Sequence, residues 1–433
     1  MHLQKYMNNK KYSIREYNFV AKSQNRNSYY DSDGNLFLKP ERFEELNNFI
    51  RSNSSLEDDS PDTFLTPSFR KGIGDILKAK NYVGVIQTLN GTSLEILPKI
   101  YGSLSIEETK IIFLKMLRTL KGVSFISSSM ADINIESMHI FDIFIQMFLN
   151  ELNLLVKRGI KSSYLQNTRT LKKIKGKINF PKNIKHNLFH KERFYCEYEE
   201  YNINRPENRI IKRTLYFLKK VCSLSKLDKE IYKFLFIFDE IEPSKNIDSD
   251  FKKCKNNRLV THYKKILNWC SIFLKNKSFT NFHGNELTFA LLFPMEKIFE
   301  SYFSNLMKKK FIHKDLLVQK KIGRLISNGN YSMVPDLIVK EENSSFIFDT
   351  KWKIIKDKIS QADLYQMFAY GTKYDRIIDN TKKIFLIYPK NEDFTNIEKH
   401  RFYDLENKKL ELYLLPFDLT NENLSLKKIK EEI

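Results

Sequence analysis

Residues 331–353 constrain the fold and the chemistry of this chain more than any other segment, because they read as two strands joined by a short turn. The first strand is expected over Tyr331–Val339, the turn over residues 341–345, and the returning strand over Phe346–Lys353. Pro335 has no amide donor and therefore suits the end or the edge of a strand. A helix is expected to follow the second strand.

Three charged side chains converge in this hairpin. Asp349 and Lys351 are two positions apart on the returning strand and therefore project from the same face. The short turn can bring Asp336 opposite them. Two converging carboxylates repel each other unless a cation lies between them, and oxygen ligands select a hard ion such as Mg²⁺ or Mn²⁺. Lys351 could then orient or deprotonate water, or balance charge on a pentacoordinate phosphate.

The pattern therefore predicts metal-dependent hydrolysis of phosphodiesters, and its flanks agree with that prediction. An amphipathic helix is expected over residues 291–309 and carries Glu300, while the helix after the hairpin has Gln366 and Tyr370 on one face. A basic cluster precedes the hairpin and consists of Lys320, Lys321 and Arg324. The alternative is a hairpin whose Asp and Lys side chains are ordinary surface residues.

The charge of the chain is unevenly distributed. The 433 residues carry a formal net charge of +21, which favours a polyanionic partner such as nucleic acid. Residues 1–150 hold 18 basic and 17 acidic side chains, whereas residues 151–433 hold 55 and 35. We therefore expect a polyanion-facing surface in the last two thirds and protein contacts in the first third.

The rest of the chain is read from its periodicity. A β-hairpin is expected over residues 82–97 around Asn90-Gly91, and short strands are expected near it. Helical spacing is found over residues 41–51, 106–121, 134–156, 208–229 and 262–275. The basic stretch 157–191 suits either a phosphate-lined groove or a solvated face. Its central lysines are Lys172, Lys173, Lys175 and Lys177.

Several classes of protein are not supported by the sequence. The chain contains no glycine-rich phosphate-binding loop, so a nucleotide is not expected to bind to it. The four cysteines are scattered, which predicts free thiols. No secretory signal and no apolar run long enough for a membrane span are visible. The chain is expected to be soluble and cytoplasmic, with no membrane partner.

The sequence resembles a known family. Asp336, Asp349 and Lys351 fill the motif of PD-(D/E)xK nucleases, and the wider pattern over residues 82–375 is similar to McrC-like nuclease subunits of McrBC-type, modification-dependent restriction systems. The first 80 residues have no counterpart in this resemblance, and the last 50 match only loosely. The further segments that carry it are Val83–Ile86, Leu94–Ile100, Arg158–Tyr164, Ile174–Ile178, Glu200–Ile203, Glu207–Lys212, Phe299–Glu300, Asp349–Lys353 and Asp363–Tyr370.

The resemblance implies an α/β fold in a multidomain, α+β arrangement. A β-rich, partner-binding N-terminal domain with a variable extension is expected over residues 1–125. A helical, basic, DNA-facing region is expected over residues 126–278, and a restriction-endonuclease-like PD-(D/E)xK domain over residues 279–433. McrC-like subunits associate with McrB-like AAA+ GTPase hexamers, stimulate GTP hydrolysis by that partner and cleave double-stranded DNA. GTP would thus be bound by the partner.

The resemblance also implies roles for single residues. Asp336 and Asp349 would ligate Mg²⁺, or Mn²⁺, together with the carbonyl of Thr350, and Lys351 would act on the attacking water. Glu300 would bind the metal or water. Gln366 and Tyr370 would brace the site or touch the DNA backbone, although core packing explains them equally well. The residues expected to bind DNA are Lys172, Lys173, Lys175, Lys177, Lys320, Lys321, Arg324 and Lys353.

Two other functions stay open. One is a stand-alone PD-(D/E)xK nuclease of repair or restriction, which would cleave DNA with Mg²⁺ and without a nucleoside triphosphate. The other is an inactive, DNA-binding adaptor of an AAA+ ring. The complete set of Asp336, Asp349 and Lys351 argues against the adaptor, because an inactive site would have no need to keep all three.

Overall fold

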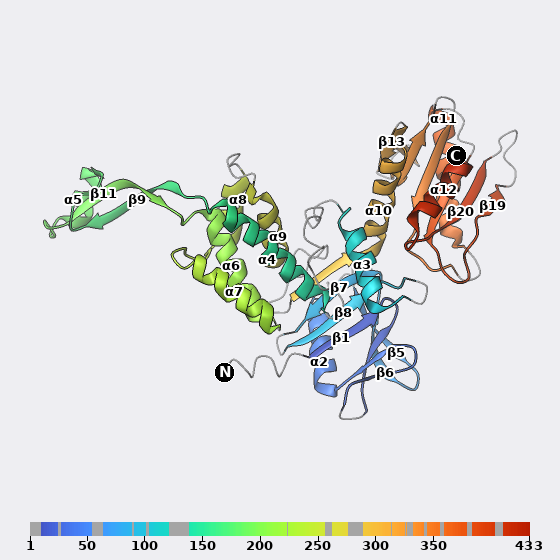
Figure 1. Ribbon diagram of the computed structural model, residues 1–433, viewed down its shortest axis with the longest axis horizontal. Helices are drawn as coiled ribbons and strands as arrows, with labels where there is room; N and C mark the ends of the chain where they lie inside the picture. Colours follow the sequence, from blue (N-terminus) through green and yellow to red (C-terminus); the bar gives the residue numbers. More distant parts are fainter. Residues whose placement is uncertain are drawn as a thin grey trace. The chain divides into compact units, whose positions relative to one another are not determined.

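The computed structural model describes residues 10–24, 27–53, 64–88, 91–100, 104–120, 138–222, 224–255, 262–275, 289–312, 314–324, 326, 332–341, 344–355, 359–378, 383–402 and 410–433. The chain forms two compact units, a smaller one that contains residues 142–277 and a larger one that contains residues 8–141 and 278–433. Figure 1 labels their helices and strands. The three-domain division expected from the sequence stays a prediction.

The first part of the larger unit is built on two sheets. One sheet has the strand order β1-β8-β7-β12 and the other β3-β4-β2-β6-β5. The hairpin expected around residue 90 is confirmed, since β7 and β8 pair antiparallel. Their elements are β1 Lys10–Arg15, β2 Phe19–Lys22, β3 Tyr29–Tyr30, β4 Leu36–Leu38, α2 Pro40–Asn53, β5 Leu65–Arg70, β6 Gly74–Ala79, β7 Tyr82–Gln87, β8 Thr92–Leu97, α3 Ile106–Leu117 and β12 Phe289–Pro294.

Strand β12 joins this sheet from a distant part of the sequence. It pairs antiparallel with β7, with Leu292 opposite Gly84. A Cβ atom at Gly84 would lie 1.9 Å from the carbonyl oxygen of Leu291, and Gly84 has a φ of +148°. Only glycine permits this close approach of the two backbones.

The helix expected to begin at Leu291 is therefore partly wrong. Residues Phe289–Pro294 are strand β12, and helix α10 begins at Met295 and ends at Lys310. The apolar run FALLFP suits a helix and a buried strand equally well. Tertiary pairing with β7 decides between them, and Pro294 stands at the boundary as the N-cap residue of α10.

The second part of the larger unit contains a six-stranded sheet of order β13-β16-β17-β18-β20-β19. The strands β17, β18 and β20 run parallel, and the outer pairs are antiparallel. The remaining elements are β13 Asp315–Val318, β14 Gly323–Arg324, β15 Ser332–Met333, β16 Leu337–Lys340, β17 Ser345–Thr350, α11 Gln361–Ile378, β18 Lys383–Pro389, β19 Glu398–Arg401, β20 Glu411–Phe417 and α12 Glu422–Glu432.

The two faces of this sheet are covered by different helices. Ile347 of β17 belongs to the apolar cluster that also holds Met367 and Tyr370 of α11. Phe348, the next residue, faces the other way, since its ring lies 6.0 Å from the ring of Phe303 in α10. Successive side chains of a strand alternate between faces, and β17 is therefore buried on both.

The strand expected over Tyr331–Val339 is interrupted. It consists of β15 and β16, and Val334–Asp336 lie between them. Pro335 cannot donate to a ladder, which explains the interruption. The returning strand ends at Thr350 rather than at Lys353, although the amide of Lys351 still donates to the carbonyl of Ile387 at 2.9 Å.

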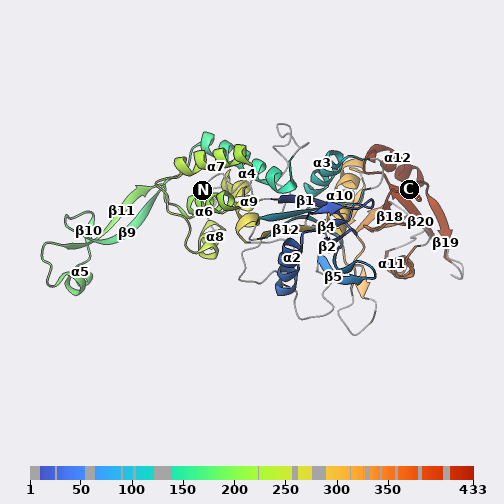
Figure 2. The ribbon, with the colours of Figure 1, turned by 90° about the horizontal axis from the view of Figure 1, so that it is seen from below.

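The smaller unit is helical, and a long β-arm extends from its helices (Figures 1 and 2). The expected helix over 208–229 is divided into α6 and α7. In the arm, β9 and β11 pair antiparallel, and β10 pairs with β11. The elements are α4 Ile140–Arg158, β9 Ser163–Leu171, β10 Lys177–Ile178, α5 Phe180–Asn187, β11 Phe194–Asn202, α6 Pro206–Val221, α7 Ser225–Ile237, α8 Ile247–Lys255 and α9 Lys264–Leu274.

The buried Asn208 fastens the base of the arm. Its Nδ2 donates to the carbonyls of Lys161 and Ile203, at 3.1 and 2.7 Å, and its Oδ1 accepts from the hydroxyl of Tyr263 at 2.9 Å. Lys161 precedes β9 and Ile203 follows β11, so one side chain holds both ends of the arm. Asn208 belongs to the segment Glu207–Lys212 of the resemblance, and these bonds give it a structural role.

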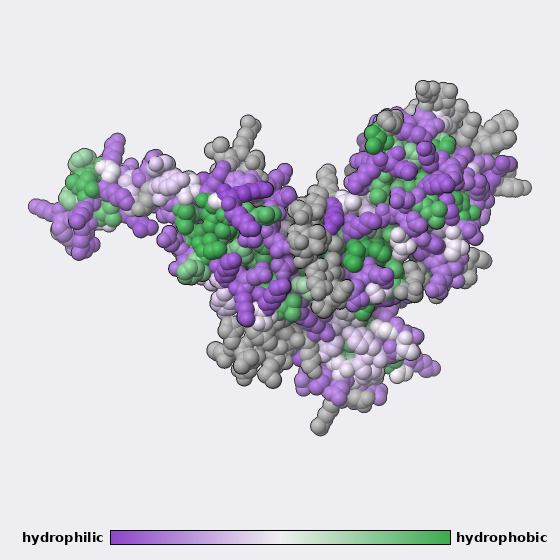
Figure 3. All heavy atoms as spheres, viewed as in Figure 1, coloured by the Kyte–Doolittle hydropathy of each residue, from purple (hydrophilic) through white to green (hydrophobic). Residues whose placement is uncertain are grey.

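The far end of the arm combines lysines with apolar side chains. Its exposed apolar residues are Ile174, Phe180, Ile184, Leu188 and Phe189, and Figure 3 shows green apolar atoms among purple ones at this end. Phe189 is 91% exposed. Such a cluster of exposed apolar side chains is typical of a surface that binds a partner.

Two further expectations concern the chain as a whole. The cysteines Cys196, Cys222, Cys254 and Cys270 are free thiols. None of the helices in the described ranges combines the length and the apolar character that a membrane crossing requires.

Candidate active site

The carboxyl end of β17 collects the side chains that the sequence singled out. Asp349 is 2% exposed and Thr350 8%, while Asp336 lies just before β16 and is half-buried. The Oδ2 atom of Asp336 accepts two hydrogen bonds from Thr350, one from its amide and one from its hydroxyl, both at 2.7 Å. The expected approach of Asp336 to the returning strand is confirmed.

Asp349 and Lys351 form an ion pair. The Nζ of Lys351 lies 2.6 Å from Oδ2 of Asp349. Oδ2 is buried, and this ammonium group compensates its charge. A buried carboxylate is costly even when it is paired and therefore calls for a functional explanation.

Helix α11 braces Lys351. The Nζ of Lys351 donates to Oε1 of Gln366 at 2.8 Å, and Nε2 of Gln366 donates to the hydroxyl of Tyr370 at 2.7 Å. That hydroxyl donates in turn to the carbonyl of Val334 at 3.3 Å. Tyr370 is 6% exposed. The chain of hydrogen bonds connects Lys351 to the backbone two residues before Asp336, so both helix residues brace the site.

Glu300 approaches from α10. Its carboxylate accepts a hydrogen bond from the side chain of Gln319, while the backbone amide of Gln319 donates to the carbonyl of Asp336 at 3.0 Å. Gln319 has a φ of +47°, an uncommon conformation for a residue other than glycine that often marks functional sites. Gln319 thus connects Glu300 with Asp336, and no sequence pattern pointed to it.

The acids of the site raise the pKa values of one another. Burial raises the pKa of Asp336, and the charges of Asp349 and Glu300 raise it further. Burial and the charge of Asp349 raise the pKa of Glu300, and burial raises the pKa of Asp349. Burial lowers the pKa of Lys351, but Asp349 and Asp336 more than offset this, and the net pKa is raised. Clustered groups with shifted pKa values are common at functional sites.

The donor set fits a hard divalent cation. In the described ranges, no three His, Cys, Asp or Glu residues form a metal-binding group. Mg²⁺, however, is usually held by one or two carboxylates together with waters and substrate phosphates. Asp336 and Asp349 meet that requirement, since the two carboxyl groups are close enough for the charge of Asp349 to raise the pKa of Asp336. Glu300 as a third ligand stays a prediction.

The basic residues expected to bind DNA lie in three places. Lys172, Lys173, Lys175 and Lys177 are exposed in the arm. Lys320 and Lys321 are exposed between β13 and β14, and Arg324 is exposed at the end of β14. Lys353 instead donates to both carboxylate oxygens of Asp363, at 2.9 and 3.0 Å. Its charge is therefore already compensated within the protein. DNA contacts by these residues stay predictions.

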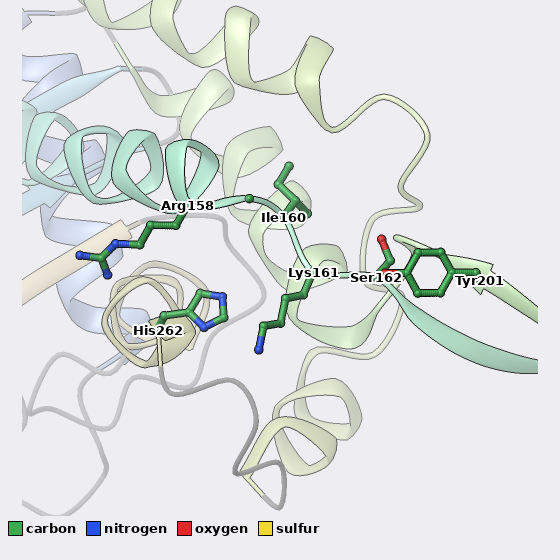
Figure 4. A pocket seen from close by; sticks show the side chains of 7 residues that line it. Arg158, Ile160, Lys161, Ser162, Tyr201 and His262 are labelled. Atoms are coloured by element: carbon green, nitrogen blue, oxygen red, sulfur yellow. The ribbon is translucent and has the colours of Figure 1, made fainter.

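A basic pocket lies at the base of the arm in the smaller unit. It has a volume of about 530 Å³ and is lined by Arg158, Gly159, Ile160, Lys161, Ser162, Tyr201 and His262. Figure 4 shows the side chains of Arg158 and Lys161 directed to the side on which His262 lies. Burial lowers the pKa of His262, and the charges of Lys161 and Arg158 lower it further. Such a pocket favours an anion.

Comparisons with known proteins concern the family and the fold of the chain. The profile of the family described as "McrBC 5-methylcytosine restriction system component" matches residues 77–389. No curated protein matches the chain. Among solved structures, the chain is similar to one in a half-complex from a tetradecameric assembly of Thermococcus gammatolerans McrB AAA+ hexamers with bound McrC. That match has a TM-score of 0.66 and 18% identity, and it covers 97% of this chain and 100% of the other.

A second structure is the Thermococcus gammatolerans McrBC complex. It matches with a TM-score of 0.45 and 17% identity over 70% of this chain and 88% of the other.

Proposed function

Because the chain belongs to the family of McrBC 5-methylcytosine restriction system components, we propose that it is the McrC-like nuclease subunit of a restriction system directed against phage DNA. It hydrolyses phosphodiester bonds of double-stranded DNA with Mg²⁺. The observation that carries this proposal is the ion pair of the buried Asp349 and the half-buried Lys351 beside Asp336. The sheet order β13-β16-β17-β18-β20-β19, with these residues at the end of β17, supports the PD-(D/E)xK arrangement that we propose for it.

Asp336 and Asp349 would hold the metal, with the carbonyl of Thr350. When bound, Mg²⁺ polarises the phosphate and lowers the pKa of a water ligand. Thr350 orients Asp336 through its amide and hydroxyl donors. Mn²⁺ also prefers oxygen ligands and is expected to substitute for Mg²⁺.

Lys351 is placed to stabilise the negative charge of the reacting phosphate. Its ammonium group lies within 2.6 Å of Asp349 and is held from the other side by Gln366. A fixed ammonium group beside the reacting phosphate stabilises the negative charge that develops there and orients the attacking water. Gln366 and Tyr370 keep it in place, and Glu300 would orient water or bind the metal.

The partner in this proposal is a McrB-like AAA+ GTPase hexamer. The similar solved assembly contains McrB AAA+ hexamers with bound McrC. The sequence carries no phosphate-binding loop, which supports GTP binding by the partner. We propose that the first part of the chain binds this partner and stimulates its hydrolysis of GTP.

DNA binding is proposed for the exposed lysines of the arm, for the basic pocket, and for the cluster of Lys320, Lys321 and Arg324. Arg158 and Lys161 face this pocket (Figure 4), and both suit a phosphate. The exposed apolar residues at the far end of the arm, such as Phe189, are instead typical of protein interfaces. Binding assays with DNA and with the partner should therefore be run on the same arm variants.

The proposal is tested by cleavage of methylated and unmethylated plasmid DNA with Mg²⁺, with and without the partner and GTP. Lys351→Ala should lower the rate by about 100-fold or more, and EDTA should abolish cleavage. The matched control is Lys399→Ala, which removes another lysine that is ion-paired with an acid, Glu432, in the same part of the chain. Its rate should equal that of the wild type.

The same assay separates the alternatives. Cleavage by the chain alone, without partner or GTP, would identify a stand-alone nuclease. DNA binding and stimulation of the partner without any cleavage would identify an adaptor. Equal rates for Lys351→Ala and the wild type would refute the role of this site.

A further inference from the structure

The indole of Trp352 is hydrogen-bonded to a carboxylate from the N-terminal part of the chain. Its Nε1–H donates to both carboxylate oxygens of Glu16, at 2.9 Å to Oε2 and 3.2 Å to Oε1, and the two residues are 336 positions apart. Glu16 has no exposed surface, and Trp352 is 3% exposed. Trp352 directly follows Lys351, so this contact reaches the candidate active site.

On the basis of the proposed nuclease function, we propose that Glu16 is a positioning residue. Through Trp352 it holds Lys351 and the end of β17 in place, and cleavage thereby depends on the contact of Trp352 with Glu16 at the ends of β1 and β8. Neither the sequence pattern nor the comparisons assign a role to Glu16.

Glu16 is rigidly held on its own side. It follows β1, and its amide donates to the carbonyl of Leu97 at 2.9 Å. The amide of Lys99 donates to its Oε2 atom at 3.0 Å. The carboxylate is therefore fixed to the ends of the parallel pair β1 and β8, and a displacement of that pair would be passed on to Trp352.

Trp352 contacts α10, which carries a residue of the site. Its ring lies 5.4 Å from the ring of Phe299, in an edge-on arrangement, and Phe299 precedes Glu300 in α10. The neighbouring residue Lys351 is bonded through its backbone amide to Ile387 of β18. A tilt of the indole would therefore move both the ammonium of Lys351 and the carboxylate of Glu300.

The partners of Glu16 require an oxygen acceptor at this position and no charge. A neutral acceptor would satisfy the indole and the amide of Lys99, whereas a buried carboxylate is costly without a cationic partner. Glu95, equally buried in the same part of the chain, has such a partner, since Lys110 lies 3.3 Å from its Oε2. Glu16 forms no ion pair with any described residue, and hydrogen bonds from Trp352 and Lys99 hold its carboxyl group.

The test combines kinetics with fluorescence. The chain has two tryptophans, so Trp269→Phe leaves Trp352 as the only fluorescent indole. In this background, kcat and KM for DNA cleavage are measured for Glu16→Ala, Glu16→Gln and Trp352→Phe, with partner, GTP and Mg²⁺ at saturation. The emission spectrum of Trp352 is measured for the two Glu16 variants.

We expect Glu16→Ala to lower kcat by about 10- to 100-fold, the usual effect of losing a group that orients a site, with KM unchanged and the emission of Trp352 shifted to longer wavelength. Glu16→Gln keeps an oxygen acceptor and should restore kcat to within about threefold. Trp352→Phe keeps the ring against Phe299 but loses the donor, so its kcat should fall as well. This variant answers the question even if Glu16→Ala does not fold.

Glu95→Ala is the matched control. It removes another fully buried acid, but the partners of Glu95 are Ser13, Lys110 and the amide of Ile140, all outside the nuclease part. Its kcat and the emission of Trp352 should match the parent. If it does not fold, Glu95→Gln takes its place. An equal fall of kcat in this control would overturn the proposal, because it would show a general effect of loosening the domain.

The outcomes distinguish this inference from the function on which it rests. No cleavage by the parent under any condition would refute the proposed function and the inference together. Cleavage by the parent that Lys351→Ala abolishes, with kcat unchanged in both Glu16→Ala and Trp352→Phe, would refute the role of Glu16 alone. A fall of kcat in these two variants, with rescue by Glu16→Gln, supports it.

Discussion

Glu16 makes the stability of the β-rich part depend on pH. Its pKa is raised from 4.5 to about 8, because burial and the charge of Glu296 outweigh the hydrogen bonds from Trp352 and Lys99 and the charge of Lys99. Because the folded pKa lies above the unfolded one, the folded state keeps a proton that the unfolded state has already released. The contribution of Glu16 is thus fully present below about pH 4.5 and is lost as the pH rises through about 8.

The size of the effect follows from the same values. The difference between 4.5 and about 8, at about 1.36 kcal/mol per pKa unit, corresponds to about 5 kcal/mol as an upper limit. Glu16→Gln removes this titration while keeping an acceptor for Trp352. Relative to the variant, the parent should therefore lose stability steadily between pH 5 and pH 9, by up to about 5 kcal/mol.

Urea unfolding followed by the emission of Trp352, in the Trp269→Phe background, measures the difference at each pH. Glu95→Gln replaces another buried acid and controls for general effects of pH on this part of the chain. Parallel pH profiles of the parent and Glu16→Gln would refute the reasoning, because they would show that Glu16 has the same pKa in the folded and unfolded chain.

Three further predictions concern the fold and the arm. Gly84→Ala should destabilise the larger unit by about 1–3 kcal/mol in thermal unfolding, because its Cβ would lie 1.9 Å from the carbonyl oxygen of Leu291; an unchanged melting temperature would contradict the close approach of β7 and β12. Asn208→Ala should increase amide hydrogen exchange at the base of the arm and cost about 1–3 kcal/mol, and equal protection in wild type and variant would rule out its fastening role. The third prediction concerns Lys172, Lys173, Lys175 and Lys177 of the arm. If the arm binds DNA, their replacement by Gln should lower the slope of log affinity against log salt by about 0.9 for each phosphate that the variant no longer neutralises. An unchanged slope would argue that the arm does not bind DNA.

Local patterns predicted much of the chain correctly. Helical spacing placed helix α3 well, since a helix was expected over residues 106–121 and α3 begins at Ile106 and ends at Leu117. The alternation of a strand placed Asp349 and Lys351 on one side, and their ion pair confirms it. The pattern misjudged residues 291–294, where an apolar run without a clear period was assigned to a helix.

The sequence by itself determined the residues that have a local signature. Asp336, Asp349 and Lys351 were found because strand alternation and a short turn act over a few residues, and Gln366 and Tyr370 because four positions make one helical turn. Tertiary structure alone decided which distant groups complete the site. Gln319 reaches Glu300 and Asp336 through an uncommon backbone conformation, and Glu16 meets Trp352 across 336 positions. Such contacts depend on how finished sheets and helices pack together, and no periodicity within one segment encodes them.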